Sequence, residues 1–183
     1  IVAGTGSSQA TAFASVGGEL WFAASAAGLG NEFWRTDGTP AGTGLVADLV
    51  PGNGSTMPSA ITEFGAQVLF YGIFGGAGGE PHLTDGTVPG TLLLADASPP
   101  WSDGNPREFR DLGGDVYFAA GSNGLGDEPY RSDGTPAGTQ MIADVQPGSF
   151  GSGPESAASV GDQVYFSGSL FGVGRELFVT DGT

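Results

Sequence analysis

An eight-residue segment occurs four times in this chain of 183 residues, and each copy begins 48 residues after the one before it. A fixed period without insertion or deletion indicates one supersecondary unit that is repeated in space. We call this segment the repeat motif. Its copies span residues 32–39, 80–87, 128–135 and 176–183.

The period divides the chain into one repeat domain of four units. A full fourth unit would need residues beyond 183, so the last unit is expected to lack its final strand. This pattern favours a segment of a longer array over a self-contained ring. The units are 1–48, 49–96, 97–144 and 145–183.

Each unit has the pattern of short strands separated by turns. The chain holds 35 glycines and 12 prolines, yet 39% of its residues are hydrophobic, which argues against disorder. Apolar and aromatic runs bounded by glycine predict four strands per unit. We therefore expect an all-β fold, a β-propeller-like array of four-stranded antiparallel blades.

Two sets of residues recur at fixed places in the predicted strands. A phenylalanine recurs in the second strand of every unit and is a predicted core residue. The Asp-Gly pair after the third strand predicts a tight type I′ hairpin turn. The core residues are Phe22, Phe70, Phe118 and Phe166, and the turn glycines are Gly38, Gly86, Gly134 and Gly182.

The charge of the chain limits its partners. Twenty acidic residues against five arginines and no lysine give a formal net charge of −15, which repels nucleic acids and anionic lipid surfaces. No apolar stretch reaches the roughly 18 residues of a membrane-spanning helix. Other protein chains or glycans remain as expected partners, without nucleic acid or membrane insertion.

The acidic residues of the repeat motif admit two interpretations. In the first, the aspartates form turns and the glutamates accept backbone N–H donors at a junction between loop and strand. In the second, both bind Ca²⁺, a cation that prefers six to eight oxygen ligands. The chain has no familiar calcium-loop spacing. The candidate Ca²⁺ ligands are Glu32, Asp37, Glu80, Asp85, Glu128, Asp133, Glu176 and Asp181.

The sequence predicts no enzyme. His82 is the sole histidine, cysteine and lysine are absent, and no nucleophile elbow or dinucleotide-binding segment occurs. Carboxylate pairs suited to glycoside hydrolysis are present by residue type, but an active site is normally unique whereas these acids recur in each unit. We expect His82 to replace an aromatic residue in a strand.

The repeat motif resembles the bacterial ELWxxDGT repeat, which occurs in tandem in large secreted or surface proteins. The glutamate and the Asp-Gly-Thr are present in all four copies, and a second Gly-Thr follows in three. Pro81, Pro129, His82, Tyr130 and Phe178 depart from the leucine and tryptophan positions. The resemblance implies an extracellular, β-propeller-like array and implies no activity.

Two main functions follow as hypotheses. The first is a structural or adhesive scaffold of a bacterial surface or secreted protein, able to self-assemble into filaments. The alternative is a carbohydrate- or peptide-binding module that uses loops 98–106 and 150–154, where Trp101 could stack on a sugar. A glycan-processing hydrolase is a third and weaker alternative.

Overall fold

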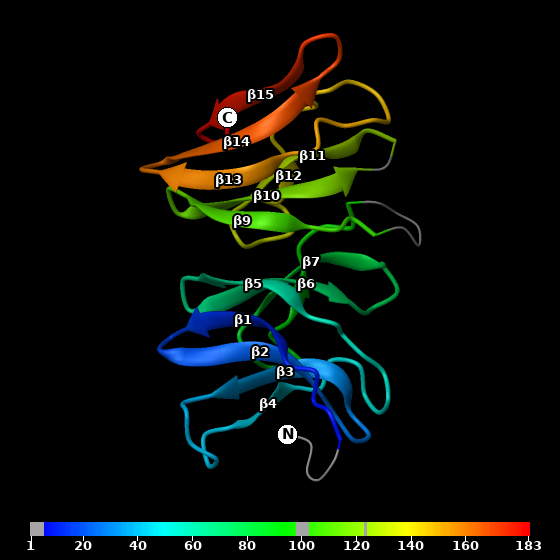
Figure 1. Cartoon of the computed structure of the whole chain (residues 1–183), viewed down its shortest axis with the longest axis vertical. Coiled ribbons are helices and arrows are strands. Elements are labelled where there is room, and N and C mark those ends of the chain that lie inside the picture. Colours follow the sequence, from blue (N-terminus) through cyan, green and yellow to red (C-terminus); the bar gives the residue numbers. More distant parts are fainter. Residues whose placement is uncertain (1–5, 98–102, 123) are drawn as a thin grey trace.

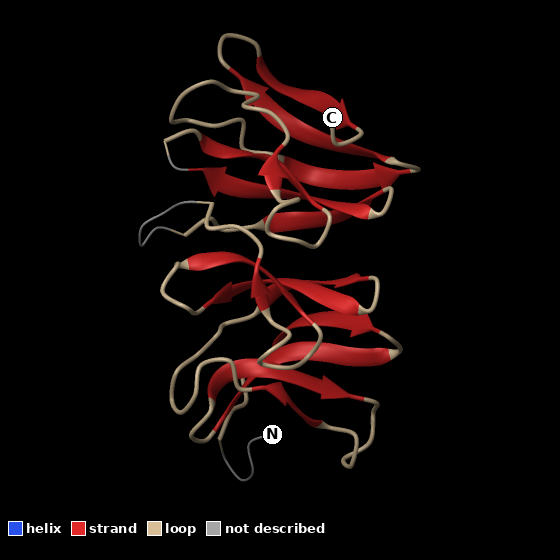
Figure 2. Ribbon diagram, turned by 180° about the vertical axis from the view of Figure 1, so that it is seen from behind, coloured by secondary structure: helices blue, strands red, loops and turns tan. Residues whose placement is uncertain are grey.

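The structure, a computed structural model, describes residues 6–97, 103–122 and 124–183. These ranges contain fifteen β-strands and no helix (Figure 1 and Figure 2). Hence no helix in the described part of the chain is suited to crossing a membrane. The prediction of an all-β fold made of antiparallel sheets is confirmed.

The strands form four antiparallel sheets, and each sheet lies within one 48-residue unit. Sheet 1 contains β1 (Thr11–Val16), β2 (Glu19–Ala26), β3 (Gly30–Thr36) and β4 (Gly44–Ala47). Sheet 2 contains β5 (Ser59–Phe64), β6 (Gln67–Ile73), β7 (Gly79–Thr84) and β8 (Leu92–Leu93). Sheet 3 contains β9 (Arg107–Leu112), β10 (Asp115–Ser122), β11 (Gly126–Ser132) and β12 (Gln140–Met141). Sheet 4 contains β13 (Glu155–Val160), β14 (Gln163–Leu170) and β15 (Gly174–Thr180).

The four sheets follow one another along the long axis of the molecule, from the N-terminal to the C-terminal end (Figure 1). The first strand of each sheet contacts the first strand of the next, in the order β1, β5, β9 and β13. Each sheet therefore has two neighbours, except for the two sheets at the ends.

Three hydrophobic clusters of the described residues lie between neighbouring sheets, and a fourth, formed by Phe22, Ala24 and Trp34, lies within sheet 1. Trp21 and Phe33 of sheet 1 pack against Val68 and Phe70 of sheet 2. Sheets 2 and 3 share a cluster that includes Leu69, Leu83, Leu94, Phe109, Val116 and Phe118, and sheets 3 and 4 share one that includes Leu112, Tyr117, Ala157, Val164 and Phe166. Because full burial of one such side chain contributes about 2 to 3 kcal/mol, a sheet gains most of its stability from its neighbours.

The recurring phenylalanine of the second strand is buried in every sheet, at most 4% exposed. It faces the variable position of the repeat motif across the strand pair: Trp34, His82, Tyr130 or Phe178. The ring centroids of Phe70 and His82 lie 5.4 Å apart, as do those of Phe118 and Tyr130. Every residue at the variable position therefore has a planar ring that can pack against the phenylalanine, and in sheet 2 this ring is the imidazole of His82.

Every first strand carries a β-bulge that the sequence did not predict. The register with the second strand shifts at the same place in all four sheets. One residue at each shift has a positive φ although it is not glycine: Ala12, Ala60, Glu108 and Ser156. Such bulges bend a strand and increase its twist, and here they recur with the period of the sequence.

Two expectations about the strands need correction. The sequence predicts fourth strands in segments 42–48, 90–96 and 138–144, but the observed strands span only 44–47, 92–93 and 140–141. The type I′ turn is wrong, because the aspartates do not have the positive φ that this turn requires at both central positions, whereas Gly38, Gly86, Gly134 and Gly182 do have positive φ. A longer loop takes its place.

Candidate functional site: the joint between neighbouring sheets

The glutamate of the repeat motif is buried and bound to the linker that leads to the next sheet. The Glu32 side chain has 0% exposure. Its carboxylate accepts the backbone N–H of Leu49 at 3.3 Å and the N–H of Thr56 at 2.9 Å. The Thr56 hydroxyl donates to it as well, at 2.5 Å. One carboxylate thus fixes both ends of the linker between sheets 1 and 2.

The same arrangement recurs at the next two joints, at the same sequence separations. Glu80 accepts the N–H groups of Ala97 at 3.1 Å and Gly104 at 2.9 Å, which are 17 and 24 residues away. Glu128 accepts the N–H groups of Val145 at 3.1 Å and Ser152 at 2.9 Å, again 17 and 24 residues away. Buried carboxylates held by several N–H donors anchor backbone strongly, because these hydrogen bonds are charge-assisted.

The three joints differ in their further donors, and at the third the N–H of Gln146 also donates to Glu128, at 3.3 Å. Thr56 and Ser152 add a hydroxyl hydrogen bond to their glutamates, whereas Gly104 at the second joint has no hydroxyl. The pKa of Glu80 is raised to about 7, mainly by burial and also by the nearby Asp96 and Asp103, and the N–H groups of Ala97 and Gly104 oppose this rise. Burial also raises the pKa of Glu32, and its hydrogen bonds to Thr56 and Leu49 oppose that effect.

The aspartate of the repeat motif closes the loop between the third and fourth strands. We call residues 37–43, 85–91 and 133–139 the Asp-Gly-Thr loops. In the first of them, Asp37 Oδ1 accepts the N–H of Thr39 and its hydroxyl, both at 2.8 Å. Thr39 Oγ1 accepts the N–H of Gly42 at 2.9 Å, and the hydroxyl of Thr43 donates to the Thr39 carbonyl at 2.7 Å.

The trailing Gly-Thr of the repeat belongs to this loop. A Cβ at Gly42 would collide with the Asp37 carboxylate, and the same holds for Gly90 with Asp85. The hydrogen bonds of Thr39 lower the pKa of the exposed Asp37. The spacing Asp-Gly-Thr-x-x-Gly-Thr therefore encodes one closed loop, and the carboxylate is one of its structural parts.

The turn glycine of each repeat motif after the first lies against the sheet before it. A Cβ built at Gly86 would lie 3.3 Å from both Trp21 and Val46 of sheet 1. At Gly134 it would lie 2.9 Å from Phe64, and at Gly182 3.0 Å from Leu112. The repeat motif thus contacts both neighbours, since its glutamate binds the linker to the next sheet and its loop lies on the previous one.

The structure gives the predicted Ca²⁺ site no support. The glutamates of the first three copies are buried on protein N–H donors, and the aspartates lie in exposed loops beyond the end of the third strand. Glu176 is exposed and accepts no hydrogen bond from a described residue, while Asp181 accepts the N–H and hydroxyl of Thr183. The described residues contain no group of three or more His, Cys, Asp or Glu placed to hold a metal ion.

His82 and the predicted binding loops were also singled out by the sequence. His82 is stacked on Phe70 and Phe74, its Nδ1 lies 2.9 Å from the Glu80 carbonyl, and burial lowers its pKa to about 4. The segment 98–102, which includes Trp101, lies outside the described residues. In loop 150–154, Phe150 is 89% exposed and Ser152 belongs to the third joint.

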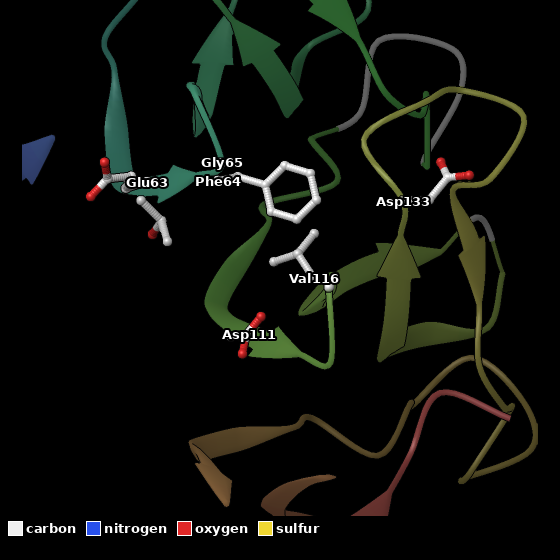
Figure 3. A pocket seen from close by; sticks show the side chains of 8 residues that line it. Glu63, Phe64, Gly65, Asp111, Val116 and Asp133 are labelled. Atoms are coloured by element: carbon white, nitrogen blue, oxygen red, sulfur yellow. The ribbon is translucent and has the colours of Figure 1, made fainter. Parts of the chain in front are cut away.

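A cavity between sheets 2 and 3 was missed by sequence reasoning. It has a volume of about 570 Å³. Its lining includes the carboxyl-bearing residues Glu63, Asp111 and Asp133, and the side chains of Phe64 and Val116 lie between them (Figure 3). Glu63 and Asp111 occupy the same position in units 2 and 3, and Asp133 belongs to the repeat motif, so only the packing of sheet 2 on sheet 3 brings the three together.

Comparisons with known proteins give a similarity of fold and no family. No family model matches the chain, and no curated protein does. A chain from a structural and mechanistic analysis of two prolyl endopeptidases is similar in structure, with a TM-score of 0.56 and 14% sequence identity. The similarity covers 91% of the present chain and 23% of that one, so the chain spans about a quarter of the solved structure it matches.

Proposed function

We propose that this chain is a structural repeat segment, a β-propeller-like scaffold of a bacterial secreted or surface protein. One observation carries the proposal: the residues that define the repeat are engaged in joining sheets. The carboxylates of Glu32, Glu80 and Glu128 are satisfied by linker donors. The resemblance to the ELWxxDGT repeat supports the secreted or surface location.

The arrangement of the sheets supports the propeller-like part of the proposal. Four short antiparallel sheets contact one another through their first strands, as blades do around a common axis. Their core lies between the sheets, so each added blade contributes stability by covering its neighbour. The bulge in each first strand supplies extra twist at the position where the sheets meet.

Glycan or peptide binding is a second candidate, and the cavity between sheets 2 and 3 favours it. The cavity is lined by Asp111 and Asp133 beside Phe64 and Val116. Carboxylates beside apolar side chains suit sugar hydroxyls or the basic groups of a peptide. We propose no catalytic role for these residues.

Urea unfolding of Glu32→Gln and Glu176→Gln tests the scaffold proposal. A neutral amide cannot accept several donors as strongly as a buried carboxylate, so Glu32→Gln should lower the free energy of unfolding by about 1 to 3 kcal/mol. Glu176→Gln is the matched control, because Glu176 is exposed and accepts no hydrogen bond from a described residue. Equal stability of both variants would contradict the proposal.

A glycan array with the unmodified chain separates the two candidates. The scaffold proposal expects no glycan to bind. If a glycan binds and Asp111→Asn abolishes the signal while the melting temperature stays the same, the cavity is a binding site and the second candidate replaces the first.

A further inference from the structure

Residues near the turn between the first and second strands form hydrogen bonds across two of the three joints. At the joint of sheets 1 and 2, the N–H of Gly17 donates to the Glu63 carboxylate at 3.0 Å. At the joint of sheets 3 and 4, the Ser159 hydroxyl donates to the Asp111 carbonyl at 2.6 Å. Among the described residues, no hydrogen bond joins the equivalent parts of sheets 2 and 3. The cavity of about 570 Å³ lies there instead.

An arginine crosses the equivalent space at the joint of sheets 3 and 4. The Arg110 Nε donates to the carbonyl of Ala157 in sheet 4 at 2.6 Å, and its guanidinium pairs with Glu108 at 3.0 Å. Thr62 occupies the position of Arg110 one unit earlier and lines the cavity. Its hydroxyl donates to a carbonyl of its own strand at 3.2 Å. The shorter side chain therefore leaves open a space that a guanidinium occupies at the next joint.

A second replacement removes cover from the side of sheet 3. A Cβ built at Gly113 would lie 3.2 Å from the Asp162 Cβ, across the joint of sheets 3 and 4. One unit earlier, the same two positions hold Gly65 and Gly114, and both line the cavity. A Cβ at Gly65 would meet no atom within 4 Å. Sheet 3 therefore leaves this part of the cavity uncovered.

The carboxylates of the cavity have no cationic partner within the chain. The exposed Asp111 carboxylate has no hydrogen bond or ion pair among the described residues, and the carboxylates of Glu63 and Asp133 accept only N–H and hydroxyl groups. The chain has no lysine, its one histidine is buried, and all five arginines pair with other acids. These pairs join Arg35 to Glu19, Arg107 to Asp127, Arg110 to Glu108, Arg131 to Asp115 and Arg175 to Glu155. A side-chain cation for the cavity must therefore come from another molecule.

We propose that the cavity between sheets 2 and 3 binds an arginine side chain of a partner protein. The guanidinium pairs with Asp111, and the methylene groups of the arginine pack on Phe64 and Val116 (Figure 3). A guanidinium suits this lining because it binds a carboxylate through two N–H groups and stacks on an aromatic ring. The cavity volume lies within the range of about 300 to 1,000 Å³ that is typical of ligand pockets. This inference deepens the second candidate function and rests on it.

An NMR titration with a short peptide tests the proposal. The probe is Gly-Ser-Arg-Ser-Gly with both ends blocked, so that the arginine carries its only charge. It should shift the amide signals of Gly65 and Gly114 until they saturate, because both glycines line the cavity. The same peptide with citrulline, a neutral isostere of arginine, should leave these signals unchanged. Added salt should weaken the binding, because ions screen an ion pair that is open to solvent.

Three variants locate the binding in the cavity, and a melting curve shows that each is folded. Asp111→Asn should weaken peptide binding by about tenfold or more. Asp162→Asn is the matched control, because it removes the same charge from an exposed turn of sheet 4, and it should bind like the unchanged chain. Thr62→Arg supplies the side chain that Arg110 provides at the next joint, and it should block the peptide.

Four results would overturn the proposal: no shift with the arginine peptide, an equal shift with the citrulline peptide, equal weakening by Asp111→Asn and Asp162→Asn, or undiminished binding by Thr62→Arg. If a glycan shifts the Gly65 and Gly114 signals and the arginine peptide does not, the cavity is a binding site for a different ligand. If neither shifts them, the second candidate function fails as well. The stability of Glu32→Gln tests the scaffold proposal separately, so the failures are distinguishable.

Discussion

The hydroxyl of Ser152 donates to the carboxylate of Glu128 at 2.6 Å, and the backbone N–H of Ser152 donates to the same carboxylate at 2.9 Å. The two residues are 24 residues apart and lie on opposite sides of the boundary between sheets 3 and 4. A buried carboxylate with fewer donors would carry a large desolvation cost. The linker therefore has one favourable path between the sheets, and the position of the next sheet follows from it.

Glu80 should give the stability of the chain an unusual pH dependence. Its pKa is raised from 4.5 to about 7 in the folded protein, so the folded state binds the proton more tightly than the unfolded state. Stability should thus fall as the pH rises from 4.5 to 7, by up to about 1.4 kcal/mol per pH unit. Urea unfolding between these pH values checks this, and Glu80→Gln should flatten the slope. A stability that rises with pH in this window in the unchanged chain, with no change in slope in Glu80→Gln, would exclude the effect.

The two glycines at the end of the first Asp-Gly-Thr loop should respond differently to alanine. Gly42→Ala places a methyl group against the Asp37 carboxylate and should cost about 1 to 3 kcal/mol of stability. A Cβ at Gly44 meets no atom within 4 Å, so Gly44→Ala should stay within about 0.5 kcal/mol. Thermal unfolding of both variants makes the comparison, and a similar loss in each would show that the loop does not depend on this close approach.

Replacement of a bulge residue by glycine should stabilise the folded protein. The four bulge residues have φ between 49° and 60°, and that of Ala12 is 52°. This region costs a residue with a Cβ about 1 kcal/mol or more. Ala12→Gly should raise the free energy of unfolding by about 0.5 to 1 kcal/mol. Ala14→Gly, in the same strand but without positive φ, should lower it. The idea is wrong if both substitutions destabilise the chain equally.

Removal of Ca²⁺ should leave the chain unchanged. Seven of the eight carboxylates of the repeat motif, all except Glu176, already accept hydrogen bonds from N–H or hydroxyl groups, so no cation is needed to hold them. The melting temperature should be the same with excess EDTA and with excess CaCl₂. A rise in melting temperature on adding CaCl₂ that is lost in Glu176→Gln would revive the calcium interpretation, because Glu176 is the motif glutamate without linker donors in the described chain.

The repeat period predicted much of the local structure. Glycine-bounded apolar runs located the second strands, where Phe22, Phe70, Phe118 and Phe166 are buried. The position of a strand depends on residues that are close together in the sequence, so a sequence pattern can predict it. The fourth strands were overestimated because the Asp-Gly-Thr loop uses the trailing Gly-Thr, and its side-chain hydrogen bonds do not appear in a propensity pattern.

The rest depends on contacts between units. The sequence left open whether Glu32 anchors backbone or binds a cation, because both roles need the same residue type at the same place. Its donors, Leu49 and Thr56, belong to the next unit, and only the packing of two sheets brings them to it. The bulge at Ala12 and the cavity beside Asp111 likewise arise where sheets meet. A sign of the joint was nevertheless present, since a hydroxyl recurs at Thr56 and Ser152, each 24 residues after a motif glutamate.

Amide hydrogen exchange at Ser152 tests most directly whether the motif glutamate joins neighbouring sheets. In the unchanged chain the Ser152 N–H donates to Glu128 and should be protected as well as the amides of a central strand such as β10. In Glu128→Gln its exchange should accelerate by about tenfold or more, while the amides in the middle of β10 stay protected. Equal exchange of the Ser152 amide in both proteins would contradict the account.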